Sequence, residues 1–314
     1  MKIRPLKPRR KEARSTLDAA GMPKKKRRLK YIAVLPSFIT LMNGACGFIA
    51  IVFASRNSEI NWNLFFMRRS SITFFALAGY LVFLAMVADL LDGRVARLTR
   101  TTSSFGGQLD SLSDAISFGV APAFLMLKLL EFHLGHLRLD NLRFVRLLER
   151  GVLFAGIFYA MCAVVRLARF NVENEEDESA HMNFAGLPSP AAAGVVVSLA
   201  VFQQQLLPWI TGRIPEMLRT FELITVFALP LVTFLTGILM VSRIRYPHVA
   251  NQLLRSKKSL PSLLVIFAFG LFIVWNIQLA MVAGFCGFAL FGVFRWIIGS
   301  LFKKGQRPAN VPEV

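Results

Sequence analysis

The sequence predicts an all-α, polytopic membrane protein with about eight transmembrane helices. Hydrophobic residues make up 55% of the 314 residues, above the roughly 45–50% of an ordinary soluble domain. They also lie in long runs, and a helix that crosses a bilayer needs about 20 mostly apolar residues. These observations exclude a disordered chain, a collagen and a soluble coiled coil, and they disfavour a soluble globular enzyme.

Each apolar run is expected to form a helix, because hydrocarbon leaves every backbone polar group to be satisfied within its own segment. The predicted helices cover residues 31–54, 72–91, 115–132, 152–167, 188–207, 223–241, 260–277 and 279–296. The last two abut and are expected to form one hairpin. We therefore predict four parts, namely a basic arm (1–30), a main transmembrane core (31–245), an additional hairpin (246–300) and a short tail (301–314).

The N-terminal arm is strongly basic. Thirteen of its 30 residues are Lys or Arg, in a chain whose net charge is +19. Such a segment cannot pack into a core, so we expect it to be disordered. Apolar runs follow at once, which favours contact with anionic lipid headgroups, at about 1 kcal/mol per basic residue, over nucleic-acid binding. We predict membrane lipids, and no nucleic acid, as partners of the arm.

The basic residues also predict the orientation, since Lys and Arg accumulate in cytoplasmic loops. With the N-terminus inside, 27 of the 37 Lys and Arg residues fall on the inner side. This predicts a multi-pass protein of an inner (cytoplasmic) membrane with both termini in the cytoplasm. Residues 138–150 carry four arginines on the opposite side, and we interpret them as an amphipathic helix lying on the membrane surface.

Four aspartates flank the junction between the second and third predicted helices. Asp89 and Asp92 are three residues apart, and Asp110 and Asp114 are four apart, so each pair shares a helix face. The short connection makes the two helices antiparallel neighbours, which brings the four carboxylates into one pocket just inside the cytoplasmic interface. Charged groups at such depth are costly and indicate a functional site.

Four converging carboxylates repel one another unless cations lie between them. Oxygen ligands favour Mg²⁺ or Mn²⁺, and a pair of such ions is a known arrangement for phosphoryl displacement. We therefore predict two divalent cations here. The structural alternative is a polar helix interface in which the aspartates pair with Arg94, Arg97 and Arg100. We disfavour it, because unrelated aspartates seldom pair twice at helical spacing across one hairpin.

The residues around the aspartates fit a phosphate-bearing substrate. Gly93 lets a ligand approach the backbone, and Ala96 keeps the same helix face open one turn later. Arg97 offers a planar fork for phosphate oxygens, and Ser103 offers a hydroxyl. Gly106, next to Gly107, allows a close approach of a helix or a ligand.

The pattern Asp89-x2-Asp92-Gly93-x2-Ala96-Arg97-x8-Gly106-x3-Asp110-x3-Asp114 resembles the signature of the CDP-alcohol phosphotransferase family at every position. The resemblance implies a catalytic, usually dimeric, six-helix membrane core with two divalent metals. It implies that Asp89, Asp92 and Asp110 are metal ligands, and that Asp114 neighbours the metal and acts as general base. Contacts with the CDP-linked donor are implied for Gly93, Arg97 and Ser103.

Four further segments resemble the integral-membrane type of phosphatidylserine synthase. They are residues 117–123, 166–171, 186–194 and 240–247. This resemblance implies CDP-diacylglycerol as donor, L-serine as acceptor and phosphatidylserine and CMP as products. One departure is Ser37, where asparagine is expected, and it weakens the assignment of the first helix to the nucleotide. Glycerol 3-phosphate or an inositol phosphate is the alternative acceptor, and a transporter or an inactive membrane scaffold is a remote alternative.

The cytoplasmic end of the fourth predicted helix carries Arg166, and Arg169 and Asn171 follow within four residues of that end. The arginines are three residues apart and are expected to face one pocket. There they would bind the lipid phosphate or the serine carboxylate, with Asn171 adding polar contacts. The structural alternative is that the arginines only anchor the cytoplasmic end of the helix.

Overall fold

The computed structural model describes residues 25–56, 59–60, 72–99, 104–136, 142–176, 186–206, 215–244, 246 and 276–304. These residues are helical apart from short connections and one antiparallel pairing, in which β1 (Glu59–Ile60) lies beside β2 (Ile72–Thr73). The predicted all-α class is confirmed.

The helices follow the predicted apolar runs. They are α1 (Lys25–Ala54), α2 (Phe74–Thr99), α3 (Ser104–Asp114), α4 (Ala121–His136), α5 (Leu142–Glu176), α6 (Ser189–Val201), α8 (Pro215–Val241) and α11 (Ile277–Lys304). A π-helical segment, η1 (Ala115–Val120), joins α3 to α4, and a second, η2 (Phe202–Leu206), extends α6. Seven of the eight predicted runs therefore fall on helices. The run 260–277 lies outside the described residues except for its last two.

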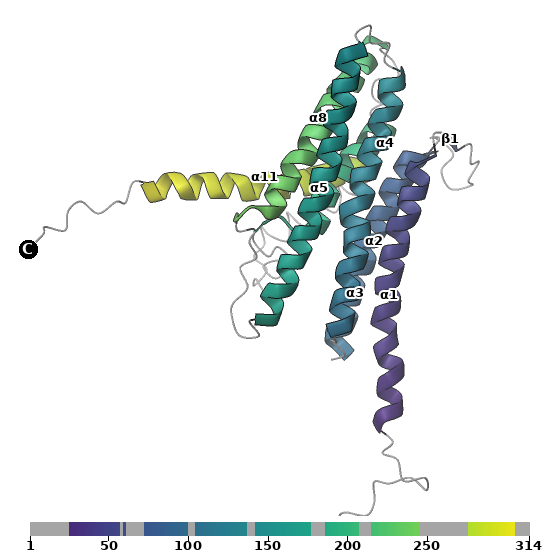
Figure 1. Cartoon of the computed structure of the whole chain (residues 1–314), viewed down its shortest axis with the longest axis vertical. Helices are drawn as coiled ribbons and strands as arrows, with labels where there is room; N and C mark the ends of the chain where they lie inside the picture. The colour runs from purple at the N-terminus through teal and green to yellow at the C-terminus, as the bar shows by residue number, and fades with distance from the viewer. Residues whose placement is uncertain are drawn as a thin grey trace, which may run out of the picture.

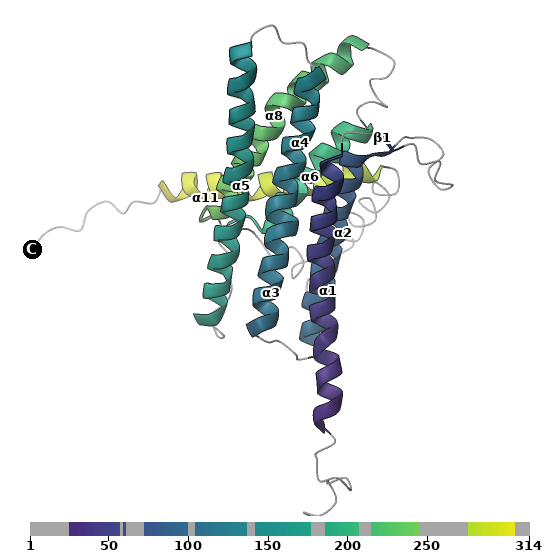
Figure 2. The same ribbon diagram turned by 45° about the vertical axis from the view of Figure 1, so that its right-hand side comes forward.

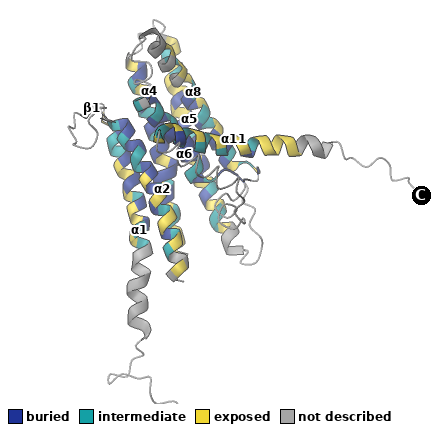
Figure 3. Cartoon of the chain, turned by 180° about the vertical axis from the view of Figure 1, so that it is seen from behind, coloured by how far each residue is buried: buried dark blue, intermediate teal, exposed yellow. Residues whose placement is uncertain are grey.

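Among the residues that the structure describes, five helical stretches are long and apolar enough to cross a membrane. They are Ser37–Ala54, Phe74–Val95, Phe105–Gly135, Arg143–Val172 and Ile277–Gly299. A shorter apolar stretch covers Phe227–Val241. Figure 3 shows exposed positions on the outer faces of these helices and buried positions between them. Large apolar side chains such as Phe48 and Leu84 are exposed there, as expected for surfaces that face lipid. The polytopic prediction is confirmed.

The helices gather around α6. In Figures 1 and 2, α1 to α5 and α8 run roughly alongside one another, whereas α11 runs across them and projects beyond the bundle. Helix α6 packs against α2, α4, α8 and α11, and residues 192–198 are all buried. Its Ala, Gly and Val residues are small enough to let neighbouring helices approach closely.

Helix α1 packs against α2, α3 and η1. A Cβ at Gly47 would lie 2.6 Å from Ser117 Cα, so only glycine permits this separation. The Ser117 hydroxyl donates a 2.8 Å hydrogen bond to the Asn43 carbonyl at the same crossing. These contacts fix α1 beside the helices that carry the four aspartates.

A tight connection leads into α6. Gly186 has φ +94°, a conformation that glycine adopts without strain. Its N–H donates to Ile244 O at 2.8 Å, and the Leu187 N–H donates to Leu239 O at 2.9 Å. These bonds hold the start of α6 against the end of α8.

Two predictions about the ends of helices are corrected. Residues 142–150 do not form a separate surface helix, because they are the first turns of the 35-residue α5. Gly151, the weakest helix former at this junction, costs only about 1 kcal/mol relative to alanine, too little to interrupt a long helix. The N-terminal arm is also shorter than predicted, since α1 already begins at Lys25; residues 1–24 lie outside the described part.

Candidate functional site

Three of the predicted aspartates converge. Asp89 and Asp92 lie in the last turns of α2, and Asp110 lies in α3. Each offers a carboxylate oxygen, and these oxygens all lie within 4.8 Å of one another. The convergence predicted from the spacing is therefore found for these three carboxylates, whereas the connection between α2 and α3, residues 100–103, lies outside the described part.

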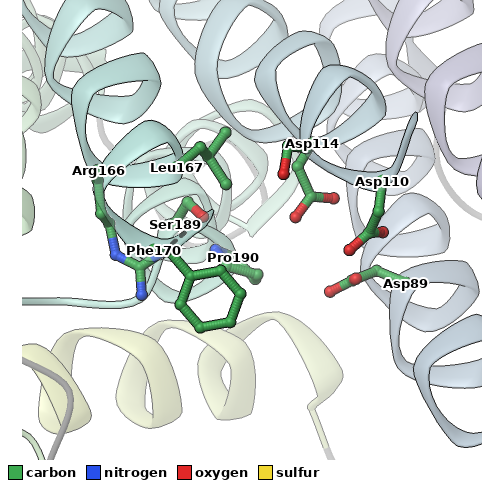
Figure 4. A pocket seen from close by; sticks show the side chains of 9 residues that line it. Asp89, Asp110, Asp114, Arg166, Leu167, Phe170, Ser189 and Pro190 are labelled. Carbon is green, nitrogen blue, oxygen red and sulfur yellow. Dashed lines mark hydrogen bonds between the residues drawn. The ribbon is translucent and has the colours of Figure 1, made fainter. Parts of the chain in front are cut away.

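Asp114 lies one turn beyond Asp110, where α3 passes into η1. It lies outside the group of three, but it lines a cavity that Asp89 and Asp110 also line. Its carboxylate lies on the same side of this cavity as theirs (Figure 4). The Asn43 side-chain amide donates a 2.8 Å hydrogen bond to Asp114 Oδ1. A π-helical segment shifts the register of a helix and is frequent at functional sites, and η1 begins directly after this residue.

The group of three has the chemistry of a site for divalent cations. Asp92 Oδ2 and Asp110 Oδ1 are buried and make no hydrogen bond. A buried carboxylate oxygen without a partner is costly, and a cation bound between these oxygens offsets that cost. Carboxylate oxygens are the ligands that Mg²⁺, Ca²⁺ and Mn²⁺ prefer. The residues therefore fit a divalent metal, without deciding which one.

Arg94 does not support the alternative of a polar helix interface, in which arginines pair with the aspartates. This side chain is exposed, and within the described part of the chain no ion pair joins it to the aspartates. The side chains of Arg97 and Arg100 are outside that part.

A cavity of about 220 Å³ opens beside the carboxylates. Its walls come from α2 and α3 on one side and from α5 and α6 on the other. The lining residues are Asp89, Asp110, Ser111, Asp114, Arg166, Leu167, Phe170, Ser189 and Pro190. Figure 4 shows the aspartates at one end of the cavity and Arg166 at the other, with Phe170 and Pro190 between them. The cavity is thus acidic at one end and basic at the other.

Helix α1 supplies two polar side chains that the sequence reasoning missed. Thr40 hydrogen-bonds to Asp92, and Asn43 is fully buried against Asp114. The available signal was the spacing of Thr40, Asn43 and Gly47, three and four residues apart within an apolar run. That spacing places all three on one helix face.

The predicted site residues near the end of α5 make different contacts. Arg166 lines the cavity, and its Nη1 donates a 3.1 Å hydrogen bond to Ser189 Oγ. The Asn171 side-chain oxygen accepts a 3.0 Å hydrogen bond from Ser111 Oγ, which ties α5 to α3.

Arg169 is exposed and is not part of the cavity wall, so the prediction that both arginines face one pocket is wrong. The wall uses Arg166, Leu167 and Phe170. At 3.6 residues per turn, these three span a face of about 100°, and Arg169 lies about 60° beyond its edge.

The predicted donor contacts are only partly within the described residues. A Cβ at Gly93 would meet nothing within 4 Å, so the α2 backbone is open there as predicted. Gly106 is half-buried on α3. Ala96 and Arg97 lie on α2, but their side chains, like the whole of Ser103, are outside the described part. These contacts stay predictions.

Comparison with known proteins agrees with this geometry. Residues 33–233 match the family model described as CDP-alcohol phosphatidyltransferase. A CDP-diacylglycerol–serine O-phosphatidyltransferase of Helicobacter pylori is 33% identical over 74% of this chain and 86% of its own length. The enzyme of the same name from Methanocaldococcus jannaschii is 28% identical over 72% of this chain and 79% of its own length. An archaetidylserine synthase of Methanothermobacter thermautotrophicus is 31% identical over 71% of this chain and 73% of its own length.

Proposed function

Because the chain belongs to the CDP-alcohol phosphatidyltransferase family, we propose that it transfers the phosphatidyl group of CDP-diacylglycerol to the hydroxyl of L-serine. The products are phosphatidylserine and CMP. The observation that carries this proposal is the convergence of Asp89, Asp92 and Asp110 within 4.8 Å of one another, at one end of a cavity that also holds Arg166. The printed names of the relatives support serine as the acceptor.

In the proposed reaction, the serine hydroxyl oxygen attacks the phosphorus that bears the diacylglycerol. A bond forms between this oxygen and the phosphorus, and the bond from the phosphorus to the CMP oxygen breaks. The hydroxyl proton passes to Asp114, whose position one turn from Asp110 places a carboxylate beside the acidic cluster. The Asn43 hydrogen bond orients that carboxylate as a general base.

The cations belong to the same proposal. Asp89, Asp92 and Asp110 would hold Mg²⁺ or Mn²⁺, with Asp114 as a neighbour, and the family resemblance implies two ions. When bound, such ions neutralise the diphosphate and stabilise the leaving oxygen. Contacts with the donor are assigned to Gly93, Ala96, Arg97, Ser103 and Gly106. Contacts with the lipid phosphate or the serine are assigned to Arg166 and Asn171.

The membrane setting follows from the position of the cluster. The aspartates lie at the ends of two apolar stretches, Phe74–Val95 and Phe105–Gly135. Acyl chains can therefore stay in the bilayer while the nucleotide reaches water. We place this end, and both termini, on the cytoplasmic side of an inner membrane, as the distribution of basic residues indicates. We also propose a homodimer, as the resemblance implies.

The acceptor is tested directly by product analysis. Purified protein with CDP-diacylglycerol and Mg²⁺ or Mn²⁺ is incubated with labelled L-serine, glycerol 3-phosphate or inositol phosphate, and the lipid is identified. Label is expected in lipid with L-serine only, because the two alternatives carry a phosphate and call for further basic side chains. Among the described lining residues Arg166 is the one cation. A labelled lipid from another acceptor, with none from serine, would overturn the assignment; Asp89→Asn is the inactive control.

A further inference from the structure

The Ser189 hydroxyl lies at the start of α6, inside the cavity wall. It is 1% exposed and accepts the 3.1 Å hydrogen bond from Arg166 Nη1. Its position is fixed from both sides, since Gly186 and Leu187 are bonded to the end of α8 and α6 is buried among its neighbours. Ser189 is therefore a rigid acceptor for a long and otherwise adaptable side chain.

Arg166 and the acidic cluster lie at opposite ends of the same cavity (Figure 4). An amino acid with a hydroxyl group has matching ends. Its carboxylate is repelled by Asp89, Asp110 and Asp114, and it is attracted by a guanidinium, which forms strong paired hydrogen bonds with carboxylates. With the carboxylate at Arg166, the hydroxyl and the ammonium group are left toward the aspartates.

We propose that Arg166 binds the carboxylate of the acceptor amino acid, and that Ser189 is the positioning residue that holds the guanidinium for this contact. This inference rests on the proposed function and specifies which of the two anionic groups Arg166 recognises. The diphosphate of the donor must lie with the cations at the acidic cluster, where its charge is neutralised. The cation across the cavity then serves the acceptor.

A second contact braces the same wall. Ser111 Oγ donates to Asn171 Oδ1 at 3.0 Å, which holds the end of α5 against α3. The distance between Arg166 on α5 and the aspartates on α3 is thus set by side chains on both helices. Such a fixed separation selects an acceptor by the spacing between its hydroxyl and its carboxylate.

The test compares Ser189→Ala with Ser198→Ala. Ser198 lies on the same helix, is equally buried, and donates to Val195 O at 3.1 Å, away from the cavity. Steady-state kinetics are measured separately for L-serine and for CDP-diacylglycerol. Ser189→Ala is expected to raise the KM for serine about fivefold, the effect of one ordinary hydrogen bond, while the KM for the donor and kcat stay within about twofold. Ser198→Ala should change none of them.

A double-mutant cycle tests whether Ser189 acts through Arg166. Residues that act through a shared contact give non-additive effects, so Ser189→Ala should add nothing to the serine KM in an Arg166→Ala background. The protection of the protein by L-serine against thermal unfolding, measured without donor, gives the same comparison without turnover. It should weaken in Ser189→Ala and persist in Ser198→Ala.

The results that would contradict the inference differ from the result that would contradict the proposed function. If the unaltered protein makes phosphatidylserine but Ser189→Ala leaves the serine KM and the serine protection unchanged, the inference is wrong and the proposed function stands. If Ser189→Ala or Arg166→Ala raises only the KM for CDP-diacylglycerol, Arg166 binds the lipid phosphate instead. If the unaltered protein makes no lipid from serine, the proposed function fails first.

Discussion

Asn43 on α1 donates a 2.8 Å hydrogen bond to the Asp114 carboxylate, 71 residues away in the chain. Both side chains are buried, and the amide leaves the other carboxylate oxygen for chemistry. The first helix is therefore part of the site, although it carries no charged residue in the stretch Ser37–Ala54. The predictions below start from this contact.

Replacing Asn43 by alanine removes the donor that orients Asp114. Because hydrogen bonds to charged groups contribute about 1.5–3 kcal/mol, kcat should fall about tenfold or more, with little change in either KM. Asn276→Ala is the matched control, since Asn276 bonds to the Leu279 N–H at the start of α11 and is not part of the cavity wall. Equal loss in both variants would mean that Asn43 only supports the fold.

Asp114→Asn tests the general base. Asparagine has nearly the same shape and keeps an oxygen for the Asn43 hydrogen bond, so metal and donor binding should be retained. Loss of a general base typically costs about 10²–10⁴-fold in rate, and kcat for phosphatidylserine formation should fall in that range. Turnover close to that of the unaltered protein would remove Asp114 from the proton transfer.

The two arginines of α5 should differ. Arg166 lines the cavity, whereas Arg169 is exposed outside it. Arg166→Ala should raise the KM for serine about tenfold or more, as expected for the loss of a charged hydrogen bond. Arg169→Ala should change it far less. Kinetics of both variants at fixed donor concentration measure the difference, and a larger effect from Arg169 would contradict the geometry of α5.

Gly47 should matter for stability because of the α1 crossing. A Cβ at this position would lie 2.6 Å from Ser117 Cα, and overpacking of this kind costs about 1–3 kcal/mol. Gly47→Ala should therefore lower the thermal midpoint in detergent. A Cβ at Gly151 on α5 would meet nothing within 4 Å, so Gly151→Ala should leave the midpoint unchanged or raise it. The reverse order would contradict the packing of α1.

Much of this architecture was predictable from the sequence, because local spacing determines it. Long apolar runs predict membrane helices, and the intervals between Asp89, Asp92, Asp110 and Asp114 predict their shared faces. One short connection then brings the two faces together. These inferences need only helical geometry and chain length.

The remainder depends on which face of a helix meets which neighbour. In the sequence, Asn43 is a single polar residue within an apolar run. Its contact with Asp114 is seen only when α1 is placed against α3. The role proposed for Ser189 depends on a hydrogen bond from Arg166, 23 residues earlier in the chain. Arg166 and Arg169 are equivalent by spacing, and only the packing of α5 separates them. The arginines at 142–150 suggest a surface helix in isolation, but the helix continues through them.

The most direct test of the account is the binding of Mn²⁺ to the purified protein, measured by electron paramagnetic resonance in the absence of substrate. The account predicts saturable binding to the unaltered protein, competition by Mg²⁺, and loss of binding in Asp89→Asn and Asp110→Asn, while Asp114→Asn retains it. Chelation with EDTA should abolish phosphatidylserine synthesis, and Mg²⁺ or Mn²⁺ should restore it. Binding of equal strength in the Asp89 and Asp110 variants, or full activity in metal-free buffer, would contradict the central claim that these carboxylates hold the cations for the transfer.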